Sequence, residues 1–231
     1  MNKVLDDILL SDNVVEEFHK NYENEEFKNW LLSVVPEVED CKNLQQDNPW
    51  HLYNCLDHIL HSVESMNKQT KGMDESTRKK LAYTMFLHDI GKPECYTRRY
   101  AKAYGREVDS FFNHNLASVK IAGRVLPAFG FNKKEQEELK LLIHEHDIFM
   151  FITVKEDGNK YHKVLTPELI RGLVKDYSRV GDGVEVLKKL IMVGGADSSA
   201  QNPELTASSF ELHDAMSDLV EELYGSKESG R

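Results

Sequence analysis

Hydrophobic residues recur at intervals of three and four along most of this chain, the spacing that places them on one face of an α-helix. The pattern predicts several short helices within residues 3–35, a section that Pro36 ends. Longer helices are expected at 49–66, 77–89, 113–127, 133–146, 167–180, 184–197 and 210–223. Asn48, Ser76 and Asn132 precede three of these segments as N-caps, and Pro49 occupies the first helical position after Asn48.

Two segments break the helical period. Residues 94–109 are rich in Arg, Tyr and Gly and are expected to form a loop or a broken helix. Residues 149–165 place two apolar runs around Asp157-Gly158, which indicates a small β-hairpin. The expected fold class is therefore an all-α helical bundle with one small β-hairpin near 149–165.

The chain has no repeat and no linker that would divide it. Its 231 residues suit one sizeable domain. We expect an N-terminal helical extension at 1–46 that packs on the core, the main domain at 47–225, and a disordered tail at 226–231.

Composition narrows the functional class. A net charge of -10 argues against the broad basic face that nucleic-acid binding needs, so a nucleic-acid partner is not expected. A small anionic ligand remains compatible with this charge, because a bound metal can invert the local field. Three cysteines without metal-pair spacing indicate reduced thiols. The sequence shows neither a membrane span nor a signal peptide, so a cytoplasmic protein is expected; its oligomeric state is left open.

The adjacent residues His88 and Asp89 are the first chemical signal. They fall at the end of a helix that Gly91 and Pro93 terminate. A carboxylate is unfavourable there, because the helix dipole is already negative at its C-terminus. A divalent metal held jointly by His88 and Asp89 would supply the missing positive charge.

Other histidines and one aspartate lie in or near apolar helical stripes, where a bundle could bring them together with this pair. They are His51, His58, His114, His144, His146 and Asp197. Imidazole and carboxylate ligands suit several divalent ions, so Mn, Fe, Ni, Mg and Zn are not distinguished. His58 is preferred to His51 as a ligand, because it lies on an apolar stripe. His144 and His146 point to different helix faces, so one of them is expected to face the metal.

The order of these motifs resembles the HD-domain metal-dependent phosphohydrolase superfamily. The resemblance rests on Phe86 to Pro93, on Phe111 to His114 with Ser118, on Leu142 to His146, and on Gly194 to Asp197. The HD region of tRNA nucleotidyltransferases and related standalone HD proteins is the closest likeness. It covers about residues 48–200 and implies an all-helical fold that hydrolyses a phosphate ester, expected to be that of a nucleotide.

The resemblance also implies roles for individual residues. The first metal is expected on His58, His88, Asp89 and Asp197, with Asp89 as the bridging carboxylate. His114 and His146 would hold a second metal or else contact the phosphate directly, so one or two ions are expected. Lys92 resembles the lysine on the phosphate side and is expected, with Asp89, to take part in catalysis. The substrate-binding residues expected are Lys92, His51, Arg99 and Ser118.

The resulting hypothesis is hydrolysis by a metal-activated water that attacks phosphorus in line. Arg98, Arg99 and Arg106 could fork onto a phosphate, although at least two of them are expected to be solvated. No serine or cysteine has the neighbours of a covalent nucleophile. Two alternatives remain: an HD module that binds metal and nucleotide without turnover, and the processing of an RNA end.

Overall fold

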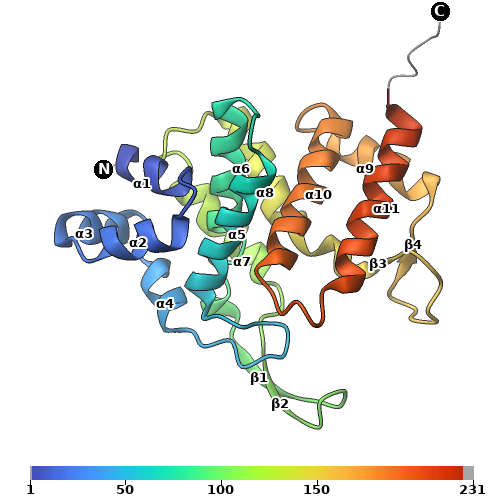
Figure 1. Ribbon diagram of the computed structural model, residues 1–231, viewed down its shortest axis with the longest axis horizontal. Coiled ribbons are helices and arrows are strands. Elements are labelled where there is room, and N and C mark those ends of the chain that lie inside the picture. The colour runs from blue at the N-terminus through green and yellow to red at the C-terminus, as the bar shows by residue number, and fades with distance from the viewer. Residues whose placement is uncertain (1, 226–231) are drawn as a thin grey trace, which may run out of the picture.

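The computed structural model describes residues 2–225, and the tail expected at 226–231 lies outside the described residues. Eleven α-helices, two short 3-10 helices and four short strands make up this part of the chain (Figure 1). The helices are α1 (Asn2–Leu9), α2 (Val14–Tyr22), α3 (Glu25–Val34), α4 (Glu37–Asn43), α5 (Cys55–Gln69), α6 (Glu75–Leu87), α7 (His114–Val125), α8 (Lys133–Glu145), α9 (Pro167–Tyr177), α10 (Gly183–Ser199) and α11 (Ala207–Tyr224). The expected all-α fold class is confirmed.

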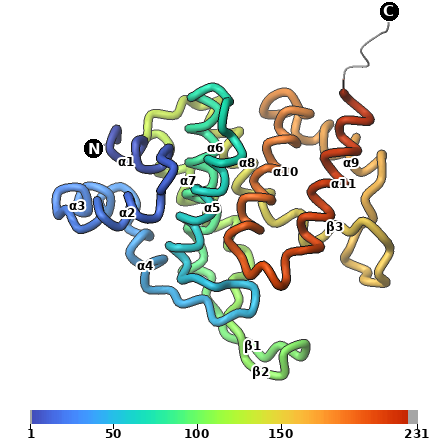
Figure 2. Tube along the Cα trace, in the orientation of Figure 1, coloured from blue at the N-terminus to red at the C-terminus, as the bar shows by residue number. Residues whose placement is uncertain are grey.

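The helices are arranged around a central group of α5, α6, α7 and α8 (Figure 2). The blue N-terminal helices α1 to α4 cover one side of this group, and α10 lies against its other side with α9 and α11 beyond it. One hydrophobic core joins the N-terminal helices to the rest: the Phe18 ring in α2 lies 6.2 Å from the Phe86 ring in α6. The core thus packs around the helices whose ends carry the predicted metal ligands.

The helix expected from Pro49 begins instead at Cys55, with Asn54 as its N-cap. Asn48 does not cap a helix, because its side chain accepts a hydrogen bond from the Trp50 amide and donates one to the Asp109 carbonyl. Residues 44–54 therefore form a loop, and His51 lies in that loop rather than in a first helical turn. At α6 the cap is likewise Asp74 and not Ser76, because Asp74 accepts from the Thr77 amide.

The antiparallel hairpin lies earlier in the chain than expected. Strands β1 (Thr97–Ala101) and β2 (Arg106–Ser110) form it within the segment predicted to be a loop or broken helix. In the segment 149–165, the structure has a 3-10 helix, η2 (His146–Phe151), and two strands, β3 (Ile152–Thr153) and β4 (Lys163–Val164), which pair in parallel. The hairpin predicted there is wrong, because the apolar run continues the turn of α8 rather than extending.

Gly91 allows the turn after α6 to lie directly on the start of α7. A Cβ atom at this position would lie 2.5 Å from the Ser118 nitrogen and 2.7 Å from the His114 oxygen. The Gly91 amide also donates a hydrogen bond to the Ser118 hydroxyl, at 2.9 Å. This contact brings His88 and Asp89 close to His114.

Among residues 2–225, no helix combines the length and the apolar character that crossing a membrane requires.

Candidate metal centre

The predicted ligands converge from five helix segments onto the carboxylate of Asp89. His58 lies on α5, His88 is the C-cap of α6, His114 begins α7, His146 follows α8, and Asp197 lies in the last turn of α10. The side chains form two groups of potential metal ligands that share Asp89. One group is His58, His88, Asp89 and Asp197, and the other is Asp89, His114 and His146.

The first group surrounds one oxygen of Asp89. Asp89 Oδ2 lies 3.0 Å from His58 Nε2 and 3.3 Å from His88 Nε2. Asp197 Oδ1 faces the same two nitrogens, at 2.9 Å from His58 and 3.4 Å from His88. Two imidazoles and two carboxylates therefore face one small, buried volume.

The second group, Asp89 with His114 and His146, lies at the other oxygen of the Asp89 carboxylate. Asp89 Oδ1 is 3.0 Å from His114 Nε2 and 3.6 Å from His146 Nε2. The two imidazole nitrogens are 3.1 Å apart. The carboxylate of Asp89 thus has the position expected of a group that bridges two cations.

Backbone carbonyls orient all four imidazoles. The Nδ1 atoms of His88, His114 and His146 each lie 2.6–2.8 Å from the carbonyl three residues earlier, and His58 Nδ1 lies 3.3 Å from the Ala200 carbonyl. A ring that donates its Nδ1 proton to a carbonyl presents the lone pair of Nε2 on its other side. All four Nε2 atoms face the cluster, an arrangement typical of metal-ligating histidines.

A cation satisfies this cluster better than neutral hydrogen bonds do. The atoms His58 Nε2, His88 Nε2 and Asp89 Oδ1 are buried without a well-oriented hydrogen-bond partner among the described residues. Lone pairs on imidazole and carboxylate repel each other at these distances unless a proton or a metal ion lies between them. The residues present therefore fit a divalent cation.

The pKa values of the metal-free cluster are governed by the attraction between its histidines and its carboxylates. Burial disfavours the charged form of His58, but the carboxylates of Asp197 and Asp89 outweigh burial and raise its pKa to about 9. The pKa of His88 rises to about 9 for the same reasons, against its burial. Although burial opposes it, neighbouring histidines hold the pKa of Asp89 and of Asp197 well below the usual range. The cluster thus attracts positive charge.

Manganese affinity is expected to depend on pH because protons compete for the Nε2 atoms. His58 and His88 have pKa values of about 9 against 6.5 for free histidine, so they bind protons at neutral pH without metal. The affinity should rise between pH 6.5 and about 9, by up to about tenfold per pH unit for each proton released. The same protons stabilise the metal-free fold below pH 6.5, a contribution lost as pH rises through about 9. Calorimetric titration in buffers of different ionisation enthalpy measures the proton release, and a pH-independent affinity would contradict this expectation.

Lys92 lies inside the cluster and not on the surface. Its ammonium is 2.5 Å from Asp89 Oδ2 and donates a hydrogen bond to Gln46 Oε1 at 2.9 Å. Burial opposes the charge, but the negative charge of Asp89 outweighs it and raises the pKa of Lys92. The side chain therefore supplies a fixed positive charge next to the bridging carboxylate.

His51 lies at the edge of the first group, in the loop 44–54. Its ring is 5.2 Å from the ring of His58, at a steep angle. Burial, with the nearby charge of Lys92, lowers the pKa of His51 to about 2, so the ring is neutral. The Asn202 amide donates a hydrogen bond to the Trp50 carbonyl at 2.9 Å, which ties this loop to the end of α10.

The structure does not bring the remaining predicted residues into the cluster. Arg98 and Arg106 both form ion pairs with Asp47 at the surface. Ser118 is fully buried and its hydroxyl accepts a hydrogen bond from the Gly91 amide, so its role as a substrate contact stays a prediction. Arg99 lies over the ring of Phe112 at 4.2 Å.

Two residues beside the cluster were not predicted. Gln46 holds the Lys92 ammonium, and Asp147 lies within 3.4 Å of both His114 and His146. The sequence does carry a signal for Asp147, because His146-Asp147 after α8 repeats the pair His88-Asp89 after α6. His144, the alternative to His146, pairs with Glu145 instead, at 2.8 Å.

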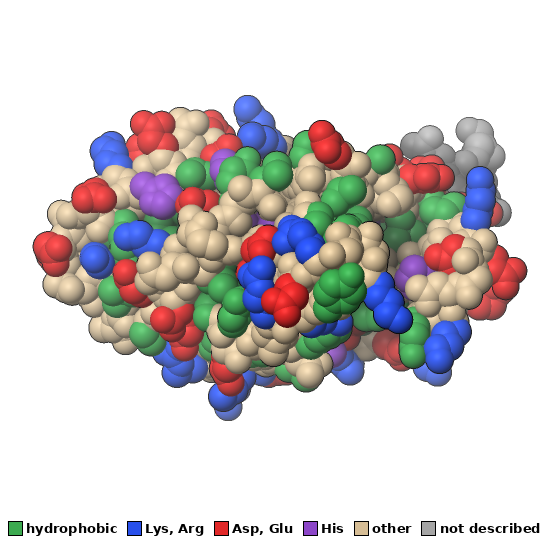
Figure 3. All heavy atoms as spheres, turned by 90° about the horizontal axis from the view of Figure 1, so that it is seen from below, with side chains coloured by type: hydrophobic (Ala, Val, Ile, Leu, Met, Phe, Trp, Pro, Cys, Tyr) green, Lys and Arg blue, Asp and Glu red, His purple; other side chains and the backbone are tan. Residues whose placement is uncertain are grey.

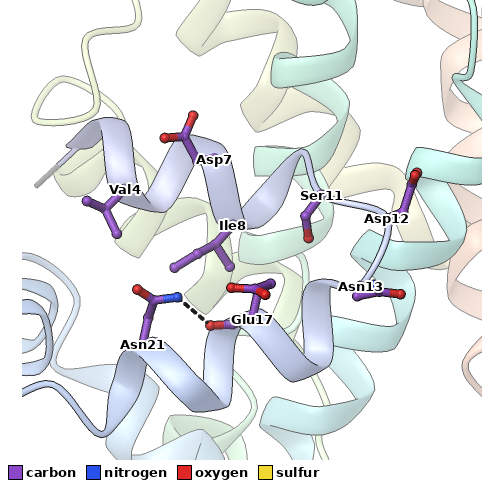
Figure 4. A pocket seen from close by; sticks show the side chains of 8 residues that line it. All are labelled: Val4, Asp7, Ile8, Ser11, Asp12, Asn13, Glu17 and Asn21. Atoms are coloured by element: carbon purple, nitrogen blue, oxygen red, sulfur yellow. Dashed lines mark hydrogen bonds between the residues drawn. The ribbon is translucent and has the colours of Figure 1, made fainter.

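Two other features of the surface are weaker candidates for the functional site than this cluster. A shallow hollow between α1 and α2 is lined by side chains that include Asp7 and Glu17, and none of its lining residues belongs to the cluster (Figure 4). On the face that carries the β1–β2 hairpin, basic and acidic side chains are intermixed and hydrophobic ones gather beside them (Figure 3). No uniformly basic surface is visible on that face.

Comparison with known proteins finds distant relatives, one of which is an enzyme from Ruegeria pomeroyi. The chain is 26% identical over 158 residues to the bifunctional uridylyltransferase/uridylyl-removing enzyme of Ruegeria pomeroyi. The alignment covers 63% of this chain but only 15% of that enzyme. No family model matches the chain. The similarity to an enzyme and the buried histidine–aspartate cluster are both compatible with a metal site of the HD type.

Proposed function

We propose that this protein is an HD-domain phosphohydrolase that cleaves the phosphate ester of a nucleotide with the help of one or two divalent metal ions. The observation that carries the proposal is the shared carboxylate of Asp89, whose two oxygens each face a separate pair of imidazoles. Paired cations held by a bridging carboxylate are typical of enzymes that displace a group at phosphorus.

The residues of the cluster would have different roles in this hydrolysis. His58, His88 and Asp197, with Asp89, would hold the first cation, and His114 and His146 would face the second. Cations in these positions would acidify water and neutralise charge on the phosphoryl oxygens. Lys92 places a permanent positive charge at Asp89, where it stabilises negative charge that develops on the phosphate.

Two observations support a nucleotide as the substrate. Phe112, two residues before His114, keeps 62% of its surface exposed, and the Arg99 guanidinium lies over its ring. An aromatic ring next to a guanidinium can stack on a base and contact a phosphate. The distant relative from Ruegeria pomeroyi is named for the removal of a uridylyl group, which is a nucleotidyl group.

Replacing Phe112 with alanine is expected to raise the KM for a nucleotide about tenfold, because base stacking on an aromatic ring contributes ~1–3 kcal/mol. The kcat should change little, and the KM for glycerol phosphate, which has no base, should stay the same. Tyr224→Ala removes an exposed aromatic ring at the end of α11 and serves as the control. An equal effect of Phe112→Ala on both substrates would argue against base stacking.

The function itself is tested by phosphate release. The purified chain is incubated with a panel of nucleotides and small phosphate esters, each with Mn²⁺, Mg²⁺, Fe²⁺, Ni²⁺ or Zn²⁺ and with a chelator. The proposal predicts release that depends on metal and is lost with the chelator. Metal and nucleotide binding without release would favour a non-catalytic binding module, and activity limited to the 3′ ends of RNA would favour the processing of an RNA end.

A further inference from the structure

Asp147 directs its carboxylate at the two histidines of the second ligand group. Asp147 Oδ2 lies 3.2 Å from His114 Nε2, and Asp147 Oδ1 lies 3.4 Å from His146 Nε2. Asp147 belongs to η2, directly after the end of α8, so the turn that fixes His146 also fixes Asp147.

Asp147 has no other polar contact that would explain this position. Within residues 2–225, its carboxylate has no ion pair or side-chain hydrogen bond except those with His114 and His146. The carboxylate two residues earlier behaves differently, because Glu145 pairs with His144 and accepts a hydrogen bond from Tyr177. A carboxylate after a helix C-terminus is also unfavourable unless positive charge is nearby.

The groups that Asp147 faces are arranged as ligands around a cation would be. The Nδ1 atoms of His114 and His146 lie within hydrogen-bond distance of backbone carbonyls, and their Nε2 atoms lie 3.1 Å apart and both face Asp147. Asp89 Oδ1, which faces the same place, is buried without a well-oriented hydrogen-bond partner. The nearby ammonium of Lys92 lies at the other oxygen of Asp89.

We infer that Asp147 is the fourth protein ligand of a second divalent cation, completing a set with Asp89, His114 and His146. This inference rests on the proposed function for the metal chemistry of the cluster. Two imidazoles and two carboxylates suit Mn²⁺ or Fe²⁺. The side chains of Asp147 and His114 are 27% and 12% exposed, whereas Asp197 and His58 of the first group are 13% and 1% exposed. The second cation would therefore be the closer to solvent and the more exchangeable of the two.

Manganese binding to the full-length chain tests the inference directly. Equilibrium dialysis with metal analysis should give two Mn²⁺ per chain, and electron paramagnetic resonance should show a spin-coupled pair. Asp147→Asn should weaken the second Mn²⁺ by at least about tenfold and abolish the coupled signal, while the first Mn²⁺ stays bound. The control Glu145→Gln removes a neighbouring carboxylate of similar exposure and should keep both ions.

A second variant separates loss of a ligand from loss of the fold. Asp147→Glu restores a carboxylate and should recover the second Mn²⁺ and the coupled signal. The inference is overturned if Asp147→Asn binds two Mn²⁺ with unchanged affinity, or if the unmodified chain binds only one. Neither result touches the proposed function, which fails only if the unmodified chain releases no phosphate from any ester with any metal.

Discussion

Replacing Asp89 with asparagine is expected to remove bound metal from both ligand groups and to lower phosphate release by at least about 1,000-fold. One carboxylate faces four imidazoles, so its loss takes an anionic oxygen from each group at once. A bound metal ion contributes several kcal/mol to stabilising the transition state of phosphoryl displacement. Metal analysis of the dialysed variant, with phosphate release under saturating Mn²⁺, gives both readouts.

The matched control for Asp89→Asn is Glu138→Gln. Glu138 is also a largely buried carboxylate, but it pairs with Lys80 and Lys189 outside the cluster. This control should keep its metal and its activity. Full metal content together with full activity in Asp89→Asn would contradict the assignment of Asp89 as the bridging ligand.

Replacing Lys92 with methionine is expected to lower kcat by about 100- to 1,000-fold, the range seen when one preorganised electrostatic donor is removed. Methionine fills a similar volume but leaves no charge 2.5 Å from Asp89. Metal binding should persist, since Lys92 is not a ligand, and this separates the variant from Asp89→Asn. Steady-state kinetics and metal analysis of the same preparation measure the two effects.

Lys120→Met is the control for Lys92→Met, because Lys120 lies on the surface and, within residues 2–225, pairs only with Glu94. Its kinetics should match those of the unmodified chain. If Lys92→Met retains the original kcat, Lys92 stabilises the fold around Asp89 and has no part in the reaction.

The helices were predictable because their apolar stripes face a shared core. The segment 132–146 illustrates this: Asn132 forms a capping box with Glu135, and the helix ends beside His146 as the pattern predicts. The β1–β2 hairpin was not predictable in the same way. Its first strand is largely exposed, and the hairpin is held by ion pairs between Arg98, Arg106 and Asp47, about fifty residues earlier in the chain. Such long-range polar contacts leave no periodic pattern in the sequence.

The site was predictable to the extent that its ligands lie at helix ends or on apolar stripes. His58, His88, Asp89, His114, His146 and Asp197, which the motif order selects, do come together in space. Gln46 could not be predicted as a site residue. It lies in a loop before the expected start of a helix, and no local sequence pattern indicates its contact with Lys92. Asp147 was missed although it follows His146 directly, because it lies between the helix expected to end at 146 and the hairpin expected at 149–165.

The most direct measurement is an anomalous difference map from crystals of the full-length chain grown with Mn²⁺. Our account predicts a strong peak bounded by His58, His88, Asp89 and Asp197, with Asp89 Oδ2 facing it. Well-ordered side chains at these four residues without an anomalous peak, at saturating Mn²⁺, would contradict the assignment of a metal centre.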